Sequence, residues 1–449
     1  MDKFKNIIIG FGKAGKTLAK YLAQHDETVL LIERSKQMYG GTCINVGCLP
    51  SKNLILNGQR GLDFTTAVNK RGEMTRQLRN KNYHMVADEP LATVWDGSAR
   101  FIDNYVLAVV MSDGTTKKVR GERIFINTGA VPNWPSIPGL EFGQRIFTSK
   151  EAMELKKQPK RLAIIGGGYI GLEFAGMFNS FGTHVTIFDQ HTRLLEREDP
   201  DIATEVVTDL TDAGIEIKSE TQLTQVKDNG EKVTLYYQQG DQTNTAEFDA
   251  VLVAVGRRPN VSSLGLENTD IALTNRGAIQ VDDHLRTTVQ NIWALGDVNG
   301  GPMFTYVSLD DFRIIIDQLF GKGDRSTADR MVIPTASFLN PPLANVGLNE
   351  HQAKSVGYNF QTFKLSVKAI PKARVLEDQR GLYKVIVDQK THLILGATLY
   401  AAEAHETINL IALAMKAKLP YERLRDMIYT HPTMSEALND LFKTPVVKS

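Results

Sequence analysis

"NIIIGFGKAG", residues 6–15, joins an apolar run to three glycines spaced G-x-G-x-x-G. Gly10 and Gly12 permit a tight turn and a close approach of a pyrophosphate to the backbone, and Gly15 lets the next helix pack against the strand. The later run "TVLLIER" reads as a second strand ending on Glu33, whose carboxylate can accept hydrogen bonds from a ribose. The stretch therefore predicts a strand–turn–helix–strand unit that binds a dinucleotide, with its phosphates at the helix N-terminus.

The same unit returns in "RLAIIGGGYIG", residues 161–171, with its glycines at Gly166, Gly168 and Gly171. A helix pattern, "LEFAGMFNSFG", and a strand pattern, "HVTIFD", follow and end on Asp189. One such motif is weak because glycine turns are common, but two complete copies predict two adenine dinucleotides. A carboxylate at this strand end favours a free ribose 2′-hydroxyl and repels a 2′-phosphate, so Asp189 predicts a preference for NADH over NADPH.

Segments beyond these units fit an α/β architecture with a further domain. "RIFINTGAVP" (123–132), "AVLVAVGRRPN" (250–260) and "NIWALGD" (291–297) each run from apolar residues into a glycine turn, as strand ends do. From about residue 335 the pattern changes, and "GLYKVIVDQKTHLILGATLY" followed by "AHETINLIALAMKAK" indicates an antiparallel sheet with helices. We expect two Rossmann-like domains and a C-terminal α+β domain.

Composition narrows the class of protein. The chain has 449 residues, enough for about three domains, and a formal net charge of +1. The near-zero charge argues against nucleic acid or a membrane surface as partner, and no apolar run approaches the roughly 20 residues of a membrane helix. We expect a cytoplasmic protein, in which permanent disulfides are rare.

The chain's only two cysteines, Cys43 and Cys48, lie in "GGTCINVGCLPSK", residues 40–52. On a regular helix their α-carbons would be about 8–9 Å apart, beyond the reach of a disulfide, so bonding needs a distorted turn, for which Gly47 provides freedom. A thiol at a helix N-terminus has a lowered pKa, which suits reversible exchange. Two cysteines cannot complete a zinc site, and a glycine-rich turn does not suit an inert core pair, so a redox-active pair is predicted.

The cysteine motif, both glycine motifs, "NIWALGD" and "HPTMSEAL" (431–438) together resemble the class I pyridine nucleotide–disulfide oxidoreductases. That family includes glutathione reductase, dihydrolipoamide dehydrogenase and mercuric reductase, and the resemblance covers essentially the whole chain. It implies a glutathione reductase-like homodimer. The implied domains are an FAD-binding domain in two parts (1–145 and 266–334), an NAD-binding domain (146–265) and an interface domain (335–449).

The resemblance also implies roles for individual residues. Cys48 would be the flavin-facing thiolate, and Cys43 the outer thiol that attacks the acceptor. The implied FAD-contacting residues are Gly10, Gly12, Gly15, Glu33, Thr42, Lys52, Ala99 near the adenine, Gly129, Asp297 on the ribityl chain, and Thr305. The implied NAD-contacting residues are Gly166, Gly168, Tyr169, Gly171, Asp189 and Gly256.

The same resemblance implies catalytic roles for five residues, of which Lys52 and Tyr169 are also cofactor contacts. Lys52, paired with Glu173, would sit beside the flavin, and Tyr169 would cover the flavin until the nicotinamide displaces it. His431, oriented by Glu436, would be the acid–base group for the outer thiol, contributed by the other subunit. Their alternatives are a solvated lysine with an ordinary partner, a core tyrosine and a packed turn histidine.

Departures within the family favour one branch of it. The chain lacks the C-terminal cysteine pair of mercuric reductases, and Asp189 argues against the NADPH site of glutathione reductase. "IIIGFGKAGKTLA" and "FTYVSLDDFRI" (304–314) resemble a bacterial type associated with hypochlorous-acid defence and copper(II) reduction. We therefore expect copper(II) as the electron acceptor.

The acceptor expectation rests on the resemblance alone. The two cysteines are the obvious soft ligands for a transient copper ion, and no stable metal site is expected. Dihydrolipoamide dehydrogenase, or another reductase of small disulfides, is the first alternative. A non-catalytic flavin redox sensor is the alternative from another class.

Overall fold

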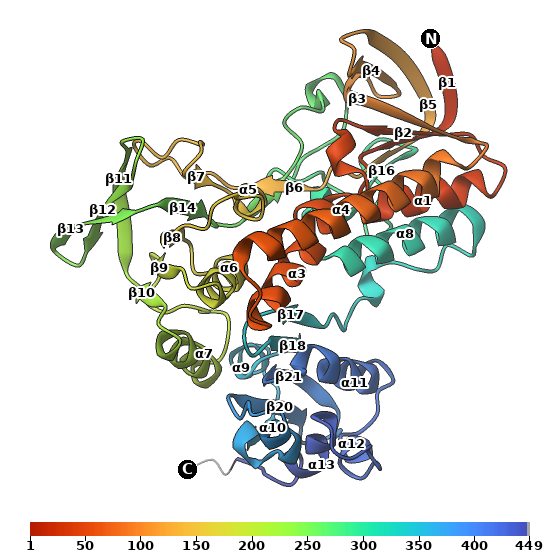
Figure 1. The fold of residues 1–449 in the computed structure, drawn as a ribbon. Coiled ribbons are helices and arrows are strands. Elements are labelled where there is room, and N and C mark those ends of the chain that lie inside the picture. The colour runs from red at the N-terminus through yellow and green to blue at the C-terminus, as the bar shows by residue number, and fades with distance from the viewer. Residues whose placement is uncertain (447–449) are drawn as a thin grey trace.

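The computed structural model describes residues 1–446 as two parallel sheets with flanking helices and a C-terminal α+β domain (Figure 1). This is the fold class expected from the sequence, including both strand–turn–helix–strand units. Among the described residues, none of the helices combines the length and apolar character needed to cross a bilayer.

The first sheet carries the N-terminal glycine motif and extends into an antiparallel meander. Strands β1, β2, β5 and β16 pair in parallel, and β3 and β5 continue into antiparallel pairing with β4. Its strands are β1 (Asp2–Ile9), β2 (Val29–Glu33), β3 (Ala92–Asp103), β4 (Val106–Met111), β5 (Thr116–Ile126) and β16 (Ile292–Ala294). Its helices are α1 (Lys13–Ala23), α2 (Thr42–Asn45), α3 (Cys48–Gln59), α4 (Phe64–Ala87) and α8 (Thr305–Phe320), of which α1, α4 and α8 run side by side in Figure 1.

The second parallel sheet carries the second glycine motif, and a three-stranded antiparallel sheet packs beside it. The parallel strands are β7 (Ile146–Phe147), β8 (Arg161–Ile165), β9 (His184–Phe188), β10 (Glu216–Lys218) and β14 (Ala250–Val253). The antiparallel strands are β11 (Thr221–Asp228), β12 (Val233–Gln239) and β13 (Gln242–Phe248), and the helices are α5 (Ser149–Ala152), α6 (Tyr169–Ser180) and α7 (Pro200–Asp212). A two-stranded ribbon of β6 (Ala130–Pro132) and β15 (Arg257–Pro259) links the two sheets.

The two glycine motifs adopt nearly the same backbone. Gly10 has φ +105° and Gly166 has φ +104°, a conformation that residues with a side chain rarely adopt. A β-carbon on Gly15 would lie 2.5 Å from the Gly10 carbonyl oxygen, and one on Gly171 would lie 2.0 Å from that of Gly166. Each helix therefore starts tightly against its own turn, which aims its N-terminal N–H groups out of the sheet edge.

The C-terminal domain is an antiparallel sheet in the order β17-β18-β21-β20-β19, with helices around it. Its strands are β17 (Thr335–Ser337), β18 (Leu343–Gly347), β19 (Phe360–Ser366), β20 (Leu382–Asp388) and β21 (Ile394–Tyr400). Its helices are α9 (Glu350–Ser355), α10 (Pro371–Val375), α11 (Ala404–Lys416), α12 (Glu422–Arg425) and α13 (Leu438–Leu441).

A buried ion cluster joins this domain to the N-terminal end of α7. Lys384, only 3% exposed, lies 2.7 Å from an Asp199 carboxylate oxygen, 2.9 Å from one of Glu350 and 3.0 Å from one of Asp201. A lysine is seldom this buried without partners, and here three carboxylates surround it. The cluster fixes the start of α7 against β20.

Candidate functional site

A cavity of about 1020 Å³ lies where the first sheet, α3, α6 and the C-terminal domain meet. It has the size of a cofactor site rather than of a surface dimple. Of the ten residues expected to contact FAD, nine line it: Gly10, Gly12, Glu33, Thr42, Lys52, Ala99, Gly129, Asp297 and Thr305. Gly15 does not line it, and its N–H donates to Asn127 Oδ1 at 2.9 Å.

Glu33 stands at the end of β2, as its strand pattern predicts. Its carboxylate accepts from the Phe11 N–H at 3.0 Å and from the Ser35 N–H at 3.1 Å, and burial raises its pKa. Each oxygen has a further lone pair for a ribose hydroxyl. With the turn at Gly10 and the open start of α1, these residues fit the ADP half of FAD.

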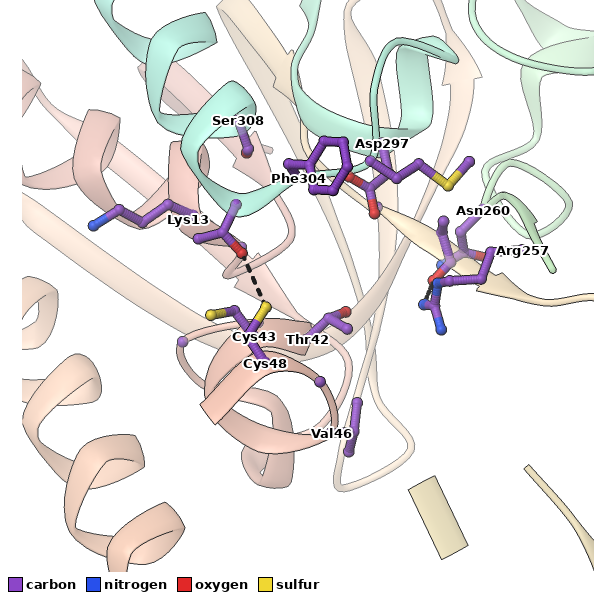
Figure 2. Close-up of a pocket in the computed structure, with 18 of the residues that line it drawn as sticks. Lys13, Thr42, Cys43, Val46, Cys48, Arg257, Asn260, Asp297, Phe304 and Ser308 are labelled. Carbon is purple, nitrogen blue, oxygen red and sulfur yellow. Dashed lines mark hydrogen bonds between the residues drawn. The ribbon is translucent and has the colours of Figure 1, made fainter. Parts of the chain in front are cut away.

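The two cysteines lie on different helices. Cys43 is in α2, Cys48 is the first residue of α3, and Gly47 between them breaks the helical path with φ −135° and ψ −118°. Figure 2 shows both side chains together at one wall of the cavity, with Asp297 and Phe304 across from them. The distorted turn expected from their spacing is therefore present.

The environment separates the two thiols electrostatically. The hydrogen bond from Cys43 lowers the pKa of Cys48 most, burial opposes it, and Thr305 and Lys52 lower it further, to about 6. The Cys48 sulfur also lies 3.5 Å from the Thr305 hydroxyl. The pKa of Cys43 is raised by its hydrogen bond to Cys48, by burial and by the Cys48 charge. The lowered pKa of Cys48, at a helix N-terminus, favours ionisation of this thiol over that of Cys43.

Exposure adds a detail that the sequence did not predict. Cys48 is the more exposed thiol and Cys43 is half-buried, although Cys43 was expected to face the solvent side. Both thiols line the cavity.

Lys52 and Glu173 are paired across α3 and α6. Lys52 Nζ lies 2.6 Å from Glu173 Oε2 and 4.9 Å from the centre of the Phe338 ring. The other Glu173 oxygen accepts from the Phe338 N–H at 2.8 Å. The carboxylate therefore positions the ammonium group within the cavity wall.

Residues of the second glycine motif lie at the next sheet edge. Tyr169, the first residue of α6, lines the cavity, whereas Gly166, Gly168, Gly171, Asp189 and Gly256 do not. Asp189 Oδ2 accepts from the Gly167 N–H at 2.5 Å, which repeats the contact of Glu33 with the first motif. Gly256 adopts φ +97° just before the ribbon strand β15.

His431 and Glu436 contact each other but not the cysteines of the same chain. Nδ1 of His431 lies 2.8 Å from Glu436 Oε2, and the imidazole is 70% exposed. Neither residue lines the cavity.

Several cavity residues were not foreseen. Asn127 joins the two ends of the site, because its amide donates to the Leu295 carbonyl at 2.7 Å while accepting from Gly15. Arg257 donates to the Ala130 carbonyl at 2.5 Å and opposes the rise in the pKa of Asp297 that burial causes. The only sign of Asn127 in the sequence was its position, as a polar residue directly after the buried strand "RIFI". Nothing in the sequence indicated that Arg257 would line the cavity.

No group of three or more His, Cys, Asp or Glu side chains within residues 1–446 is arranged to hold a metal ion.

Comparison with known proteins decides the family. Residues 4–311 match the pyridine nucleotide-disulphide oxidoreductase model, and residues 333–442 match the dimerisation domain of that name. The chain belongs to this family. Pyridine nucleotide–disulfide oxidoreductases bind FAD and NAD(P)H, so the chain is a flavoprotein oxidoreductase with a dimerisation domain.

Relatives within the family are similar along nearly their whole length. The probable pyridine nucleotide-disulfide oxidoreductase RclA of Escherichia coli K12 is 48% identical over 98% of this chain and 99% of that protein. A mercuric reductase of Lysinibacillus sphaericus is 33% identical over 97% of this chain and 82% of that protein. The solved Cu(II) complex of the HOCl-induced flavoprotein disulfide reductase RclA from Escherichia coli superimposes with a TM-score of 0.95 at 47% identity, covering 99% of each chain.

Proposed function

We propose that this flavoprotein takes electrons from NADH and passes them through a Cys43–Cys48 disulfide to copper(II), as part of defence against hypochlorous acid in the cytoplasm. The observation that carries the redox part is the Cys48 thiol at the start of α3, with a pKa of about 6, on the cavity that Gly10 and Glu33 also line. A thiolate-forming cysteine beside a dinucleotide motif suits electron transfer between a bound cofactor and a disulfide.

The residues divide the work as follows. FAD, when bound, supplies a carrier that accepts two electrons from NADH and releases them to the disulfide. Cys48 is held as the thiolate on the cofactor side by Thr305, Lys52 and the α3 N-terminus. Cys43 is the thiol that meets the acceptor, and the Lys52–Glu173 pair keeps a positive charge beside the cavity.

The acceptor step balances for copper. The reduced pair, in which Cys48 is already a thiolate, releases two electrons and the one proton of Cys43 as the disulfide re-forms, and two copper(II) ions each accept one electron. Thiolates are preferred ligands of copper(I), so both sulfurs can hold the ion during transfer. The similarity to a protein solved as its Cu(II) complex supports this choice.

The quaternary arrangement is part of the same proposal. We assign the exposed imidazole of His431, held by Glu436, to Cys43 of a second subunit, an assignment supported by its absence from the cavity lining of its own chain. We also propose the domain division given by the resemblance: FAD-binding at 1–145 and 266–334, NAD-binding at 146–265 and interface at 335–449. The FAD and NAD contact residues that the resemblance implies belong to the same proposal.

An acceptor panel tests the proposal. Purified holoenzyme with NADH is offered copper(II), lipoamide, glutathione disulfide, a quinone and oxygen, with Cys43→Ser as the matched variant. We expect copper(II) turnover that falls at least tenfold in Cys43→Ser, while transfer to quinone and oxygen is largely kept. Faster turnover of lipoamide than of copper(II) would support the dehydrogenase alternative, and no turnover with any acceptor would support a sensor.

A further inference from the structure

The Tyr169 side chain, at the start of α6, is held by a hydrogen bond beside the cavity. Its hydroxyl donates to Glu198 Oε1 at 2.6 Å, and the Asn345 amide donates to the same oxygen at 3.1 Å. Tyr169 follows Gly168 directly and lines the cavity, while Asn345 comes from β18 of the C-terminal domain. Three separate segments thus meet at one carboxylate oxygen.

Glu198 is an unusual residue to bury at this place. It is 7% exposed, and no ion pair among the described residues includes it. Burial raises its pKa, against the hydrogen bonds from Tyr169 and Asn345. An unpaired buried carboxylate is costly, so the two neutral donors compensate much of its desolvation.

The backbone around Glu198 cannot follow a movement of the tyrosine ring. The Asn349 amide donates to the Arg197 carbonyl at 2.7 Å on one side of Glu198. On the other side, Asp199 is held by Lys384 at 2.7 Å and by the Glu350 N–H at 3.2 Å. A displacement of the ring that the Glu198 side chain cannot follow by rotating about its own bonds therefore breaks the hydrogen bond to Glu198.

We propose that Glu198 is a positioning residue that latches Tyr169 closed, so that binding of the nicotinamide dinucleotide must first break the Tyr169–Glu198 hydrogen bond. The inference rests on the proposed role of Tyr169 as the side chain that the nicotinamide displaces. If only a fraction of the molecules is in the state that can bind, the apparent dissociation constant equals the intrinsic one divided by that fraction. A hydrogen bond to a buried carboxylate is strong enough to weaken the binding of NAD⁺ by roughly 3- to 10-fold.

A double-mutant cycle on binding tests the latch. The dissociation constant of NAD⁺ for the oxidised, FAD-loaded protein is measured by titration calorimetry, with FAD content checked by absorbance. The variants are Tyr169→Phe, Glu198→Ala and both together, since Tyr169→Phe keeps the ring and removes only the donor. If Glu198→Ala fails to fold, Tyr169→Phe still decides.

A matched control exists in the same pair of domains. The Tyr400 hydroxyl donates to Asp209 Oδ2 at 2.8 Å, again joining the C-terminal domain to the α7 region, and Tyr400 does not line the cavity. Tyr400→Phe removes the same kind of bond and should leave the affinity for NAD⁺ unchanged.

The latch predicts that each single variant binds NAD⁺ about 3- to 10-fold more tightly and that the double variant gains no more than either one. Unchanged or weaker binding in Tyr169→Phe overturns the latch, and so does an equal gain in Tyr400→Phe. A wild-type protein that binds neither NAD⁺ nor NADH contradicts the proposed function itself, and the latch with it.

Discussion

At the scale of single residues, Asp189 shows how a strand-end carboxylate is held for recognition. Its Oδ2 accepts from Gly167, and its Oδ1 accepts from the His191 N–H at 2.9 Å and lies 2.6 Å from the His191 ring. The acid was predictable because its place after the strand is set by the motif. The His191 contact was not, because nothing in the sequence says how that ring turns.

Replacing Asp189 should weaken discrimination between the two nicotinamide cofactors. Asp189→Ala removes the repulsion of a 2′-phosphate and the acceptor of the ribose hydroxyls. We expect the ratio of kcat/KM for NADH to that for NADPH to fall about tenfold, roughly 1.4 kcal/mol. His184→Ala, at the exposed start of the same strand, should leave the ratio unchanged, whereas a wild-type preference for NADPH would refute the assignment.

At the scale of elements, the two strand–turn–helix–strand units were predictable because their constraints are local. Gly10 and Gly166 need positive φ, and a β-carbon on Gly171 would meet the carbonyl of Gly166 within the same turn. The Tyr169–Glu198 contact left no such trace, since it joins residues 29 apart that only the fold brings together.

Gly168, at the N-terminal end of α6, and Gly176, inside α6, allow two effects to be tested apart: the close approach of a ligand to the backbone and the stability of the helix. Neither would bring a β-carbon within 4 Å of another part of the protein. Gly168→Ala should leave the melting temperature nearly unchanged but weaken NAD⁺ binding at least tenfold, because the pyrophosphate approaches the backbone there. Gly176→Ala, inside α6, should stabilise the protein by about 0.5–1 kcal/mol and leave binding unchanged. Calorimetry of both variants checks this, and normal NAD⁺ affinity in Gly168→Ala would contradict it.

At the scale of the whole molecule, Lys384 connects the C-terminal domain to α7. Burial lowers its pKa, but hydrogen bonds to Asp199, Glu350 and Asp201 outweigh this, and the net pKa is raised. That a C-terminal dimerisation domain follows the dinucleotide-binding part could be predicted from motif order. The ion cluster around Lys384 could not be predicted, because its members lie far apart in the chain and each one resembles an ordinary surface charge in the sequence.

Removing Lys384 from the ion cluster should lower the stability of the protein by an amount that depends on pH. Lys384→Met leaves the buried Asp199 carboxylate without an ion pair and removes one partner each from Asp201 and Glu350. We expect a loss of about 3–5 kcal/mol in the free energy of unfolding. Lys364→Met is the control: Lys364 pairs with Asp201 at 2.5 Å but is one-third exposed, and its loss should cost under about 1 kcal/mol.

The sign with pH follows from the shifted groups. Burial raises the pKa values of Asp201 and Glu350, but their hydrogen bonds and lysine neighbours lower them overall. The two carboxylates stabilise the fold at pH values above their ordinary pKa values near 4, and this stabilisation is lost as the pH falls below them. The stabilisation from Lys384 is lost only as the pH rises past its ordinary pKa of about 10.4. Chemical denaturation should show the largest difference in unfolding free energy between the wild type and Lys384→Met near pH 7, with the two values converging below about pH 4. A difference that stays constant with pH would contradict the stabilising role of the ion cluster.

The most direct test of the central claim is the visible absorbance spectrum of the two FAD-loaded single-cysteine variants. If Cys48 is the flavin-side thiolate, Cys43→Ser should show a long-wavelength thiolate–flavin band before any reductant is added, growing as pH rises through the pKa of Cys48 in that variant. Cys48→Ser should lack the band at every pH while its flavin is still reduced by NADH. A band in Cys48→Ser alone would reverse the roles of the two thiols, and its absence from both variants between pH 5 and 9 would contradict the account of the cysteine pair.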